Sequence, residues 1–233
     1  MRMPVSVIIP AINEGENISS VLSAIPPGVA DEVIVVDGGS TDDTVARAQA
    51  GGARIVTELR RGYGRACASG VGSAQGDVLI FMDADGADDP TQTPDLLAPI
   101  LAGSADMVLG SRLAGEMAPG SMLWHQEFGN RLVAWLIRQY YGLRITDLSP
   151  FRAVKREKLS ELGMVDMTYG WPTEMIVKAA LRDWRVVEVP VRYRPRQAGR
   201  SKISGTLRGT VLATYRILCT VFRYSIGRRR PRG

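Results

Sequence analysis

Two aspartates directly after an apolar run are the residues of this chain best suited to bind a metal ion. The apolar residues 78–82 lead into Asp83, Ala84 and Asp85, followed by a turn rich in Gly, Asp and Pro. Side chains two positions apart on a strand point the same way, so the two carboxylates should lie together where the strand ends. At ~4 Å and an effective dielectric of about 20 they repel by roughly 4 kcal/mol, which a divalent cation with oxygen ligands reverses. The alternative that these residues alone leave open is an acidic turn that caps the next helix.

Two further polar turns in the amino-terminal half suit a nucleotide. Residues 5–10 form an apolar run that leads into Ala11, Asn13 and Glu14, and residues 32–36 lead into Asp37 and Gly38. Ligands of open α/β sheets bind at the carboxyl ends of the strands, where a carboxylate can hold ribose hydroxyls and glycine permits close approach. Each turn taken alone is equally compatible with a structural cap.

The elements that must position these turns follow the pattern of βαβ units, which predicts an α/β fold with a mostly parallel central sheet. Strands are expected at residues 5–10, 32–36, 53–56, 78–82, 107–110, 151–155 and 186–191. Helices are expected at residues 17–24, 41–50, 64–74, 94–102, 128–141, 155–162, 173–180 and 206–226. Residues 113–121 are predicted to form a mobile loop and residues 192–204 a basic loop.

The three polar turns together resemble the P-x-x-N-E, V-V-D-D-G-S-x-D-x-T and D-A-D motifs of the family-two glycosyltransferases, which have the GT-A fold. Four later segments look like motifs of the dolichyl- or polyprenyl-phosphate sugar synthases: Gly110-Ser111-Arg112, Asp147-Leu148-Ser149-Pro150-Phe151-Arg152, Glu188-Val189-Pro190-Val191 and the segment from Arg196 to Lys202. The motifs follow the family's order over residues 4–205. The resemblance implies a GT-A catalytic domain at residues 1–204 that acts as a metal-dependent, inverting hexosyltransferase.

The resemblance also implies a donor site and its cofactor. A nucleoside diphosphate sugar, of the GDP-mannose or UDP-glucose type, would contact Pro10, Ala11, Asn13, Glu14, Asp37, Gly38, Asp83, Ala84, Asp85, Arg200 and Lys202. Asp83 and Asp85 would hold Mg2+ or Mn2+. Positive charge from a metal and from cationic side chains stabilises a leaving diphosphate without proton transfer. Arg196, Arg200 and Lys202 share a loop that could close over the bound donor.

The identity of the acceptor decides which further groups the reaction needs. A polyprenyl phosphate, which the resemblance implies, is already an anionic nucleophile and needs only positive charge nearby. A sugar or lipid hydroxyl would instead need a general base, for which Glu174 is the candidate. The acceptor residues expected on this basis are Arg112, His125, Asp147, Ser149 and Arg152. The expected catalytic residues are Asp85, Arg112, Arg152, Glu174 and Lys202.

The chain departs from the family's pattern at four positions. Gly38 replaces the second Asp of V-D-D-G, Pro150 replaces a Gly, and Ala87 stands where the lipid-phosphate synthases often carry a Gln near the metal. His125, the only histidine, lies near the usual place of an acceptor-phosphate arginine. These departures leave open the hydroxyl acceptor and, from another class, a non-catalytic nucleotide-sugar-binding module that docks on membranes. A nucleotidyltransferase is disfavoured because no Gly-rich phosphate loop with a following Lys opens the chain.

The charge of the chain is divided unevenly and bears on its partners. Residues 1–188 carry 17 basic and 24 acidic side chains, whereas twelve Lys and Arg and no acidic residue follow Glu188. Arginines recur along the apolar helix expected at residues 206–226, which predicts an amphipathic membrane-interface segment with a basic tail at residues 205–233. The alternative is that this helix packs on the domain or on a second subunit. The arginines interrupt any span of ~20 apolar residues, and the acidic body argues against nucleic acid as a partner.

The remaining features concern the compartment. The chain has two cysteines, Cys67 and Cys219, in contexts that suit a reducing environment, and its first strand begins almost at once, without the pattern of a signal peptide. We therefore expect a cytoplasmic enzyme peripherally associated with the membrane. Further partners considered are a membrane protein or a second copy of the chain.

Overall fold

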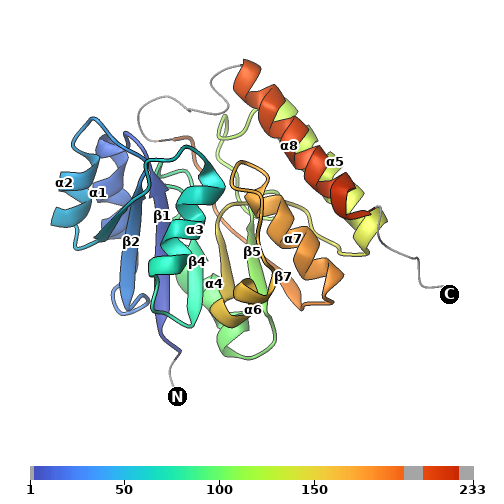
Figure 1. The fold of residues 1–233 in the computed structure, drawn as a ribbon, viewed down its shortest axis with the longest axis horizontal. Helices are drawn as coiled ribbons and strands as arrows, with labels where there is room; N and C mark the ends of the chain where they lie inside the picture. The colour runs from blue at the N-terminus through green and yellow to red at the C-terminus, as the bar shows by residue number, and fades with distance from the viewer. Residues whose placement is uncertain (1–2, 197–206, 226–233) are drawn as a thin grey trace.

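The computed structural model describes residues 3–196 and 207–225, with the side chains of residues 207–214 excepted. Its centre is a seven-stranded sheet with the order β3-β2-β1-β4-β6-β5-β7 (Figure 1). The strands are β1 (Val5–Ala11), β2 (Glu32–Asp37), β3 (Arg54–Thr57), β4 (Val78–Phe81), β5 (Met107–Ser111), β6 (Arg152–Lys155) and β7 (Val186–Pro190). Neighbouring strands are parallel except at β6, which is antiparallel to both β4 and β5. The predicted α/β fold with a mostly parallel sheet is confirmed.

Helices cover both faces of the sheet. The helices α1 (Gly15–Ala24), α2 (Thr44–Ala50) and α4 (Thr93–Leu101) contribute to one apolar core. The helices α3 (Tyr63–Ser73), α5 (Trp124–Tyr141), α6 (Arg156–Glu161), α7 (Trp171–Leu181) and α8 (Leu207–Ser225) contribute to the core on the other face. A short 3-10 helix, Pro90–Gln92, precedes α4. Strands covered on both faces can be apolar throughout, which is why β4 is a continuous apolar run in the sequence.

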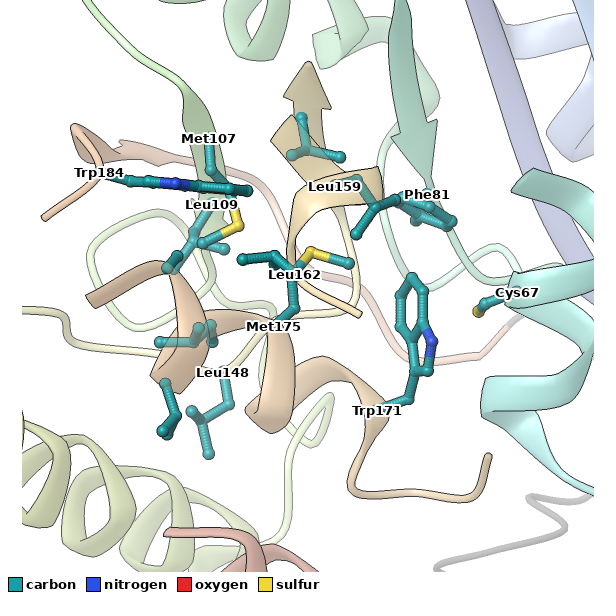
Figure 2. Packing of buried hydrophobic residues seen from close by; sticks show 14 of the residues in the cluster. Cys67, Phe81, Met107, Leu109, Leu148, Leu159, Leu162, Trp171, Met175 and Trp184 are labelled. Atoms are coloured by element: carbon teal, nitrogen blue, oxygen red, sulfur yellow. The ribbon is translucent and has the colours of Figure 1, made fainter. Parts of the chain in front are cut away.

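The core on the side of α7 fixes the strand that leads into the aspartate pair. Figure 2 shows Phe81 at the end of β4 against Trp171 at the start of α7, and their rings meet edge to face with centroids 5.0 Å apart. Both side chains are almost fully buried. This aromatic contact places the beginning of α7 next to the point where the chain leaves the sheet toward Asp83.

Two segments between β5 and β6 differ in detail from expectation. The helix expected to begin at residue 128 begins at Trp124, and its added first turn is capped because the Leu123 amide donates to Gln126 Oε1 at 2.9 Å. Residues 113–121 are irregular, as expected, but are tied to the segment after β7. Tyr193 N donates to Glu116 O, and Ala118 N donates to Tyr193 O, each at 2.9 Å.

The last helix packs against the domain along one of its faces. Val221 is fully buried, and its carbonyl accepts a hydrogen bond from the Tyr141 hydroxyl of α5. Tyr224 donates from its hydroxyl to Glu174 Oε1 of α7 at 2.6 Å. Packing on the domain, which was the alternative to a membrane role, is thus observed for this face of α8. The helices that the structure describes include none with the length and hydropathy needed to cross a bilayer.

Candidate active site

The motif residues meet at one edge of the sheet. The parallel strands β1, β2, β4 and β5 all end there, at Ala11, Asp37, Phe81 and Ser111. The antiparallel β6 begins at the same edge, where Arg152 pairs with Phe81 of β4 and with Leu109 of β5. Segments far apart in the sequence therefore build one site, at the edge where open α/β sheets bind their ligands.

The turns after β1 and β2 are locked to each other. Asp37 is buried, and its carboxylate accepts hydrogen bonds from the Gly39 and Ser40 amides, each at 3.1 Å. Asn13 has a positive φ of 49° and accepts at its side-chain oxygen from the Thr41 amide at 2.7 Å. Gly38 donates from its amide to the Ala11 carbonyl at 2.9 Å. Asn13 and Asp37 thus shape the surface that the resemblance assigns to the nucleoside, and Pro10 lies at the same strand end, paired with Val36.

The aspartate pair lies at the end of β4 in a cluster of carboxylates. Burial, and then the charge of Asp85, raises the pKa of Asp83 to about 7, although Tyr63 donates a hydrogen bond to Asp83 Oδ1 at 3.2 Å. Asp85 is more open and accepts from the Ala87 amide at 3.0 Å. Asp88 is buried, and its Oδ1 has no hydrogen-bond partner among the described residues. Burial, and then the charge of Asp83, raises the pKa of Asp88 to about 8.

This cluster has the chemistry that a divalent cation requires. Neighbouring carboxylates that repel one another are stabilised by a cation of two charges. The described residues contain no ready-made group of three or more His, Cys, Asp or Glu side chains that could hold a metal ion. Mg2+ is commonly held by one or two carboxylates together with substrate phosphates, so Asp83 and Asp85 fit a site that the donor's diphosphate completes.

Arg196 supplies positive charge to this cluster. Its guanidinium bonds to Glu14 Oε1 and lies 3.5 Å from Asp85 Oδ2. It thereby joins the turn after β1 to the turn after β4. Arg200 and Lys202, which were predicted to contact the donor, lie outside the described residues.

Removal of the Arg196 charge should strengthen binding of Mn2+ in the absence of donor. The Arg196→Gln variant leaves Glu14 and Asp85 less compensated, so we expect the affinity for free Mn2+ to rise by about fivefold, measured by calorimetry. Arg194→Gln is the matched control, because Arg194 pairs with Asp89 at 3.1 Å instead. Unchanged or weaker binding of Mn2+ in Arg196→Gln would show that Arg196 and the cation do not compete.

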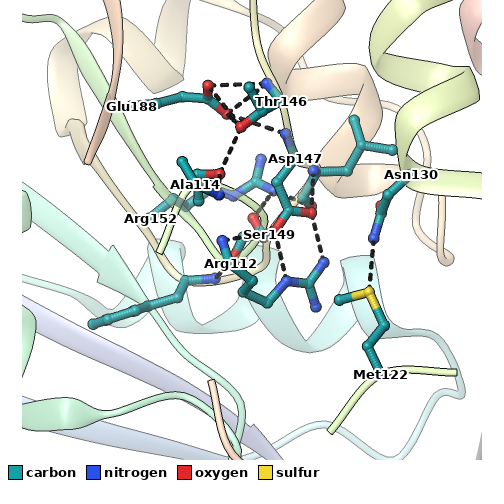
Figure 3. A network of polar contacts seen from close by, with 12 residues as sticks. Arg112, Ala114, Met122, Asn130, Thr146, Asp147, Ser149, Arg152 and Glu188 are labelled. Carbon is teal, nitrogen blue, oxygen red and sulfur yellow. Dashed lines mark hydrogen bonds and ion pairs between the residues drawn. The ribbon is translucent and has the colours of Figure 1, made fainter. Parts of the chain in front are cut away.

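The other end of the site is built around a buried ion pair (Figure 3). Arg112 Nε and Nη2 donate to the two carboxylate oxygens of Asp147, each at 2.7 Å, and the Arg112 amide donates to the same carboxylate at 2.9 Å. Burial would raise the pKa of Asp147, but the Arg112 guanidinium holds it below its usual range. The Arg112 guanidinium also lies over the Tyr193 ring, 5.0 Å from its centroid. Asp147 therefore orients Arg112 and is itself fully buried.

Two acceptor residues are placed inside the protein. Arg152 is 1% exposed, and its guanidinium donates to the carbonyls of Pro172 at 2.8 Å, Leu148 at 3.1 Å and Ser149. Burial lowers the pKa of Arg152 to about 10. The donors of Arg152 are used by the main chain that precedes β6 and begins α7, so any role of Arg152 toward an acceptor phosphate would rest on its charge rather than on direct contact. Ser149 is also fully buried, and its hydroxyl accepts from the Phe151 amide at 3.2 Å.

The surroundings of Glu174 argue against the general-base role considered for it. Its carboxylate is fully buried and accepts from the Val165 amide at 3.0 Å, the Asp166 amide at 2.8 Å and the Tyr224 hydroxyl. Lys178 Nζ lies 2.8 Å from the same carboxylate. Burial opposes ionisation, but these partners lower the pKa of Glu174. A base must reach the proton that it abstracts, and this carboxylate is occupied in holding α7 to its neighbours.

The Glu174→Gln variant should therefore lose stability and keep its chemistry. We expect the free energy of unfolding to fall by about 3 kcal/mol, since Lys178 loses its buried charge partner. Below the unfolding temperature, the rate of transfer should stay within about threefold of wild type. Urea unfolding and initial rates measure the two effects. Glu161→Gln, in an exposed pair with Lys158 at 3.8 Å, is the matched control. A stable Glu174→Gln protein with ~100-fold lower activity would restore the general-base mechanism.

His125 is placed in the first turn of α5, half-buried beside Trp124, with ring centroids 5.7 Å apart.

Three contributors to the site were missed in the sequence: Tyr63, Asp88 and Tyr193. Asp88 belongs to the acidic turn and could have been singled out by its closeness to Asp85. Tyr63 and Tyr193 carry no comparable signal, because each reaches the site only through the packing of a distant element.

The polar turns after β1 and β2, together with the acidic cluster after β4, favour a transferase that acts on a nucleotide sugar. The model of the family described as glycosyl transferase family 2 matches residues 6–163, and the chain belongs to this family. The expected enzyme class, a glycosyltransferase, is thereby confirmed.

Curated relatives extend the similarity beyond the matched segment. The chain is 42% identical over 211 residues to an uncharacterized glycosyltransferase of Mycobacterium tuberculosis, covering 90% of this chain and 94% of the relative. It is 33% identical over 225 residues to the undecaprenyl-phosphate mannosyltransferase of Micrococcus luteus, covering 89% of this chain and 90% of the relative. The resemblance to the polyprenyl-phosphate sugar synthases is thus supported over nearly the whole chain.

A solved structure matches the fold. The crystal structure of glucosyl-3-phosphoglycerate synthase from M. tuberculosis, in complex with Mn2+, UDP-glucose and phosphoglyceric acid, superposes with a TM-score of 0.78 and 27% sequence identity. The match covers 98% of this chain and 81% of that protein. Another crystal structure of the same synthase contains Mg2+ and UDP. The expected cofactor, Mg2+ or Mn2+, agrees with these complexes.

Proposed function

We propose that this protein transfers a hexose from a nucleoside diphosphate sugar to a polyprenyl phosphate, with inversion, in a reaction that requires Mg2+ or Mn2+. The observation that carries the choice of acceptor is that neither Asp147 nor Glu174 is available as a base. Asp147 is neutralised by Arg112, and Glu174 is enclosed by the segment that precedes α7 and by α8. An acceptor that brings its own anionic oxygen needs no base. The similarity to the undecaprenyl-phosphate mannosyltransferase supports the same acceptor.

The proposed division of labour follows from the positions of the side chains. The turns held by Asn13 and Asp37 would shape the nucleoside site, and Asp83 and Asp85 would hold the cation. A divalent cation supplies positive charge to a leaving diphosphate. Arg112, fixed by Asp147 and 11% exposed, would donate hydrogen bonds to the acceptor phosphate. An acceptor oxygen would then form a bond to the anomeric carbon as the bond to the diphosphate oxygen breaks.

A second candidate acceptor is a small phosphorylated acid. It is favoured by the fold match to a synthase whose crystal structure contains phosphoglyceric acid. Both candidates share the anionic phosphate and differ in whether a lipid carries it.

A direct assay separates the two acceptors. The full chain with Mn2+ and a panel of UDP- and GDP-hexoses is offered undecaprenyl phosphate in detergent or phosphoglyceric acid in buffer, and the products are identified by mass spectrometry. We expect a glycosyl phosphate lipid and no glycosylated acid. Transfer only to the small acid would replace the proposed acceptor, and transfer to neither would refute both.

A further inference from the structure

Helix α5 carries a row of large apolar side chains that faces away from the core. Trp124, Phe128, Leu132 and Trp135 are 80%, 63%, 38% and 54% exposed. Their spacing of three and four residues places them on one side of the helix. The buried residues of α5 lie on the opposite side and pack in the core: Val133, Ala134, Ile137 and Tyr141. We name the four exposed residues the aromatic stripe.

The aromatic stripe is not explained by the stability of the domain. Exposed apolar side chains that form a contiguous patch typically mark an interaction site. The chain has four tryptophans, of which Trp171 and Trp184 are only 2% and 7% exposed. The other two both lie on the stripe. A partner that accepts large aromatic rings is therefore expected on this side of α5.

The neighbouring helix adds aromatic rings and positive charge. Figure 1 shows α8 running beside α5, and the rings of Tyr140 and Phe222 meet edge to face at 5.7 Å between centroids. Tyr215 is 61% and Phe222 41% exposed. Arg216 and Arg223 of α8 are exposed as well, and Arg138 is exposed on α5. No acidic residue follows Glu188 in the sequence, so the exposed side chains described on α8, at residues 215–225, carry only positive charge.

We propose that the aromatic stripe and the exposed face of α8 form a docking surface for an anionic lipid bilayer, with both helices lying in the plane of the interface. Trp and Tyr rings favour the headgroup level of a membrane, and nearby Arg side chains are attracted to anionic lipids. A second copy of the chain fits less well, because a symmetric contact would bring two basic faces together.

The surface is adjacent in the sequence to the acceptor end of the site. Residues 113–123 connect Arg112, next to the end of β5, to the beginning of α5. A short stretch of chain thus joins the proposed membrane-docking surface to Arg112. The docking surface deepens the proposed function, on which it rests, because it explains how a lipid acceptor reaches the enzyme. Vesicle binding needs neither donor nor acceptor, so the docking surface and the proposed acceptor can be refuted separately.

Tryptophan fluorescence tests the docking surface in the full chain. The protein is titrated with vesicles of phosphatidylcholine alone or mixed with phosphatidylglycerol, and binding is measured independently by co-sedimentation. Because Trp171 and Trp184 are already buried, a blue shift would report transfer of Trp124 and Trp135 into the interface. We expect co-sedimentation and a blue shift with the anionic vesicles, both weakened by added salt.

Paired variants locate the binding surface. Phe128→Ala with Leu132→Ala leaves both reporter tryptophans in place and should weaken binding by about tenfold or more. Leu101→Ala with Leu181→Ala is the matched control, since these leucines are 53% and 36% exposed on other helices and should not matter. Both double variants should transfer sugar in detergent at the wild-type rate.

Three outcomes would overturn the docking surface. The wild-type chain could fail to bind anionic vesicles, or the two double variants could weaken binding equally. In the third outcome the chain binds no vesicles but forms a dimer, and Phe128→Ala with Leu132→Ala dissociates it. Failure of transfer to undecaprenyl phosphate in detergent, with vesicle binding intact, would refute the proposed acceptor and leave the docking surface standing.

Discussion

The Asp85→Asn variant is expected to transfer sugar at least about a thousandfold more slowly than wild type, and Asp83→Asn nearly as slowly. In the proposed reaction the leaving diphosphate would gain negative charge as its bond to the sugar breaks, and a cation held by these carboxylates would be the main source of compensation. The loss should appear both in the initial rate at saturating donor and in Mn2+-dependent donor binding, measured by calorimetry.

Stability measurements separate this effect from misfolding. The pKa of Asp83 is raised in the folded protein, so its charge destabilises the metal-free fold at neutral pH. Asp83→Asn should therefore melt no lower than wild type in the absence of metal. Asp95→Asn, at an exposed carboxylate in the first turn of α4, is the matched control and should leave activity unchanged. Full activity of Asp85→Asn would show that Asp85 does not hold a cation that the transfer requires.

The second large effect is expected at the Arg112–Asp147 pair. Asp147→Asn leaves a buried guanidinium without its charge partner, which should lower the free energy of unfolding by about 3 to 5 kcal/mol. Arg112 would also lose the two bonds that orient it, so we expect transfer at temperatures below unfolding to fall by about a hundredfold. Urea unfolding and initial rates report the two effects.

The pH dependence gives an independent check of the ion pair. The pKa of Asp147 is lower in the folded protein than its usual value of 3.8, so the pair stabilises the fold above about pH 4. This contribution should be lost as the pH falls further, and Asp147→Asn should flatten that part of the stability curve. Glu127→Gln, in a surface pair with Arg131, is the control and should cost at most about 0.5 kcal/mol. Equal effects of the two variants would contradict the role of the buried pair.

The meeting of the first three polar turns at one edge of the sheet was predictable, because short, local patterns identify the strands that lead into them. Apolar runs of strand length identify β1, β2 and β4, and parallel strands end at a common edge, so the turns that follow them had to meet there. The positions of Asp37, Asp83 and Asp85 follow from that rule alone. The pKa values of Asp83 and Asp88 are raised by burial, and a local sequence pattern does not predict how deeply a side chain is buried.

The acceptor end was less predictable because it depends on how distant segments pack. Arg112, Asp147 and Arg152 belong to recognisable motifs, but only the antiparallel insertion of β6 between β4 and β5 buries Arg152 among main-chain carbonyls. Glu174 opens a helix in the sequence, and only the contacts from residues 165–166 and from Tyr224 show that it is enclosed.

The sequence by itself determined the fold class, the family and the placement of Asp37, Asp83 and Asp85 at one edge of the sheet, because strand periodicity and strand-end motifs act over a few residues. Only the tertiary structure decided which charges are compensated. Arg196 reaches Glu14 across 182 positions, and Arg112 reaches Asp147 across 35. Burial and pairing across such separations set whether a charged side chain remains available for a substrate or holds the protein together.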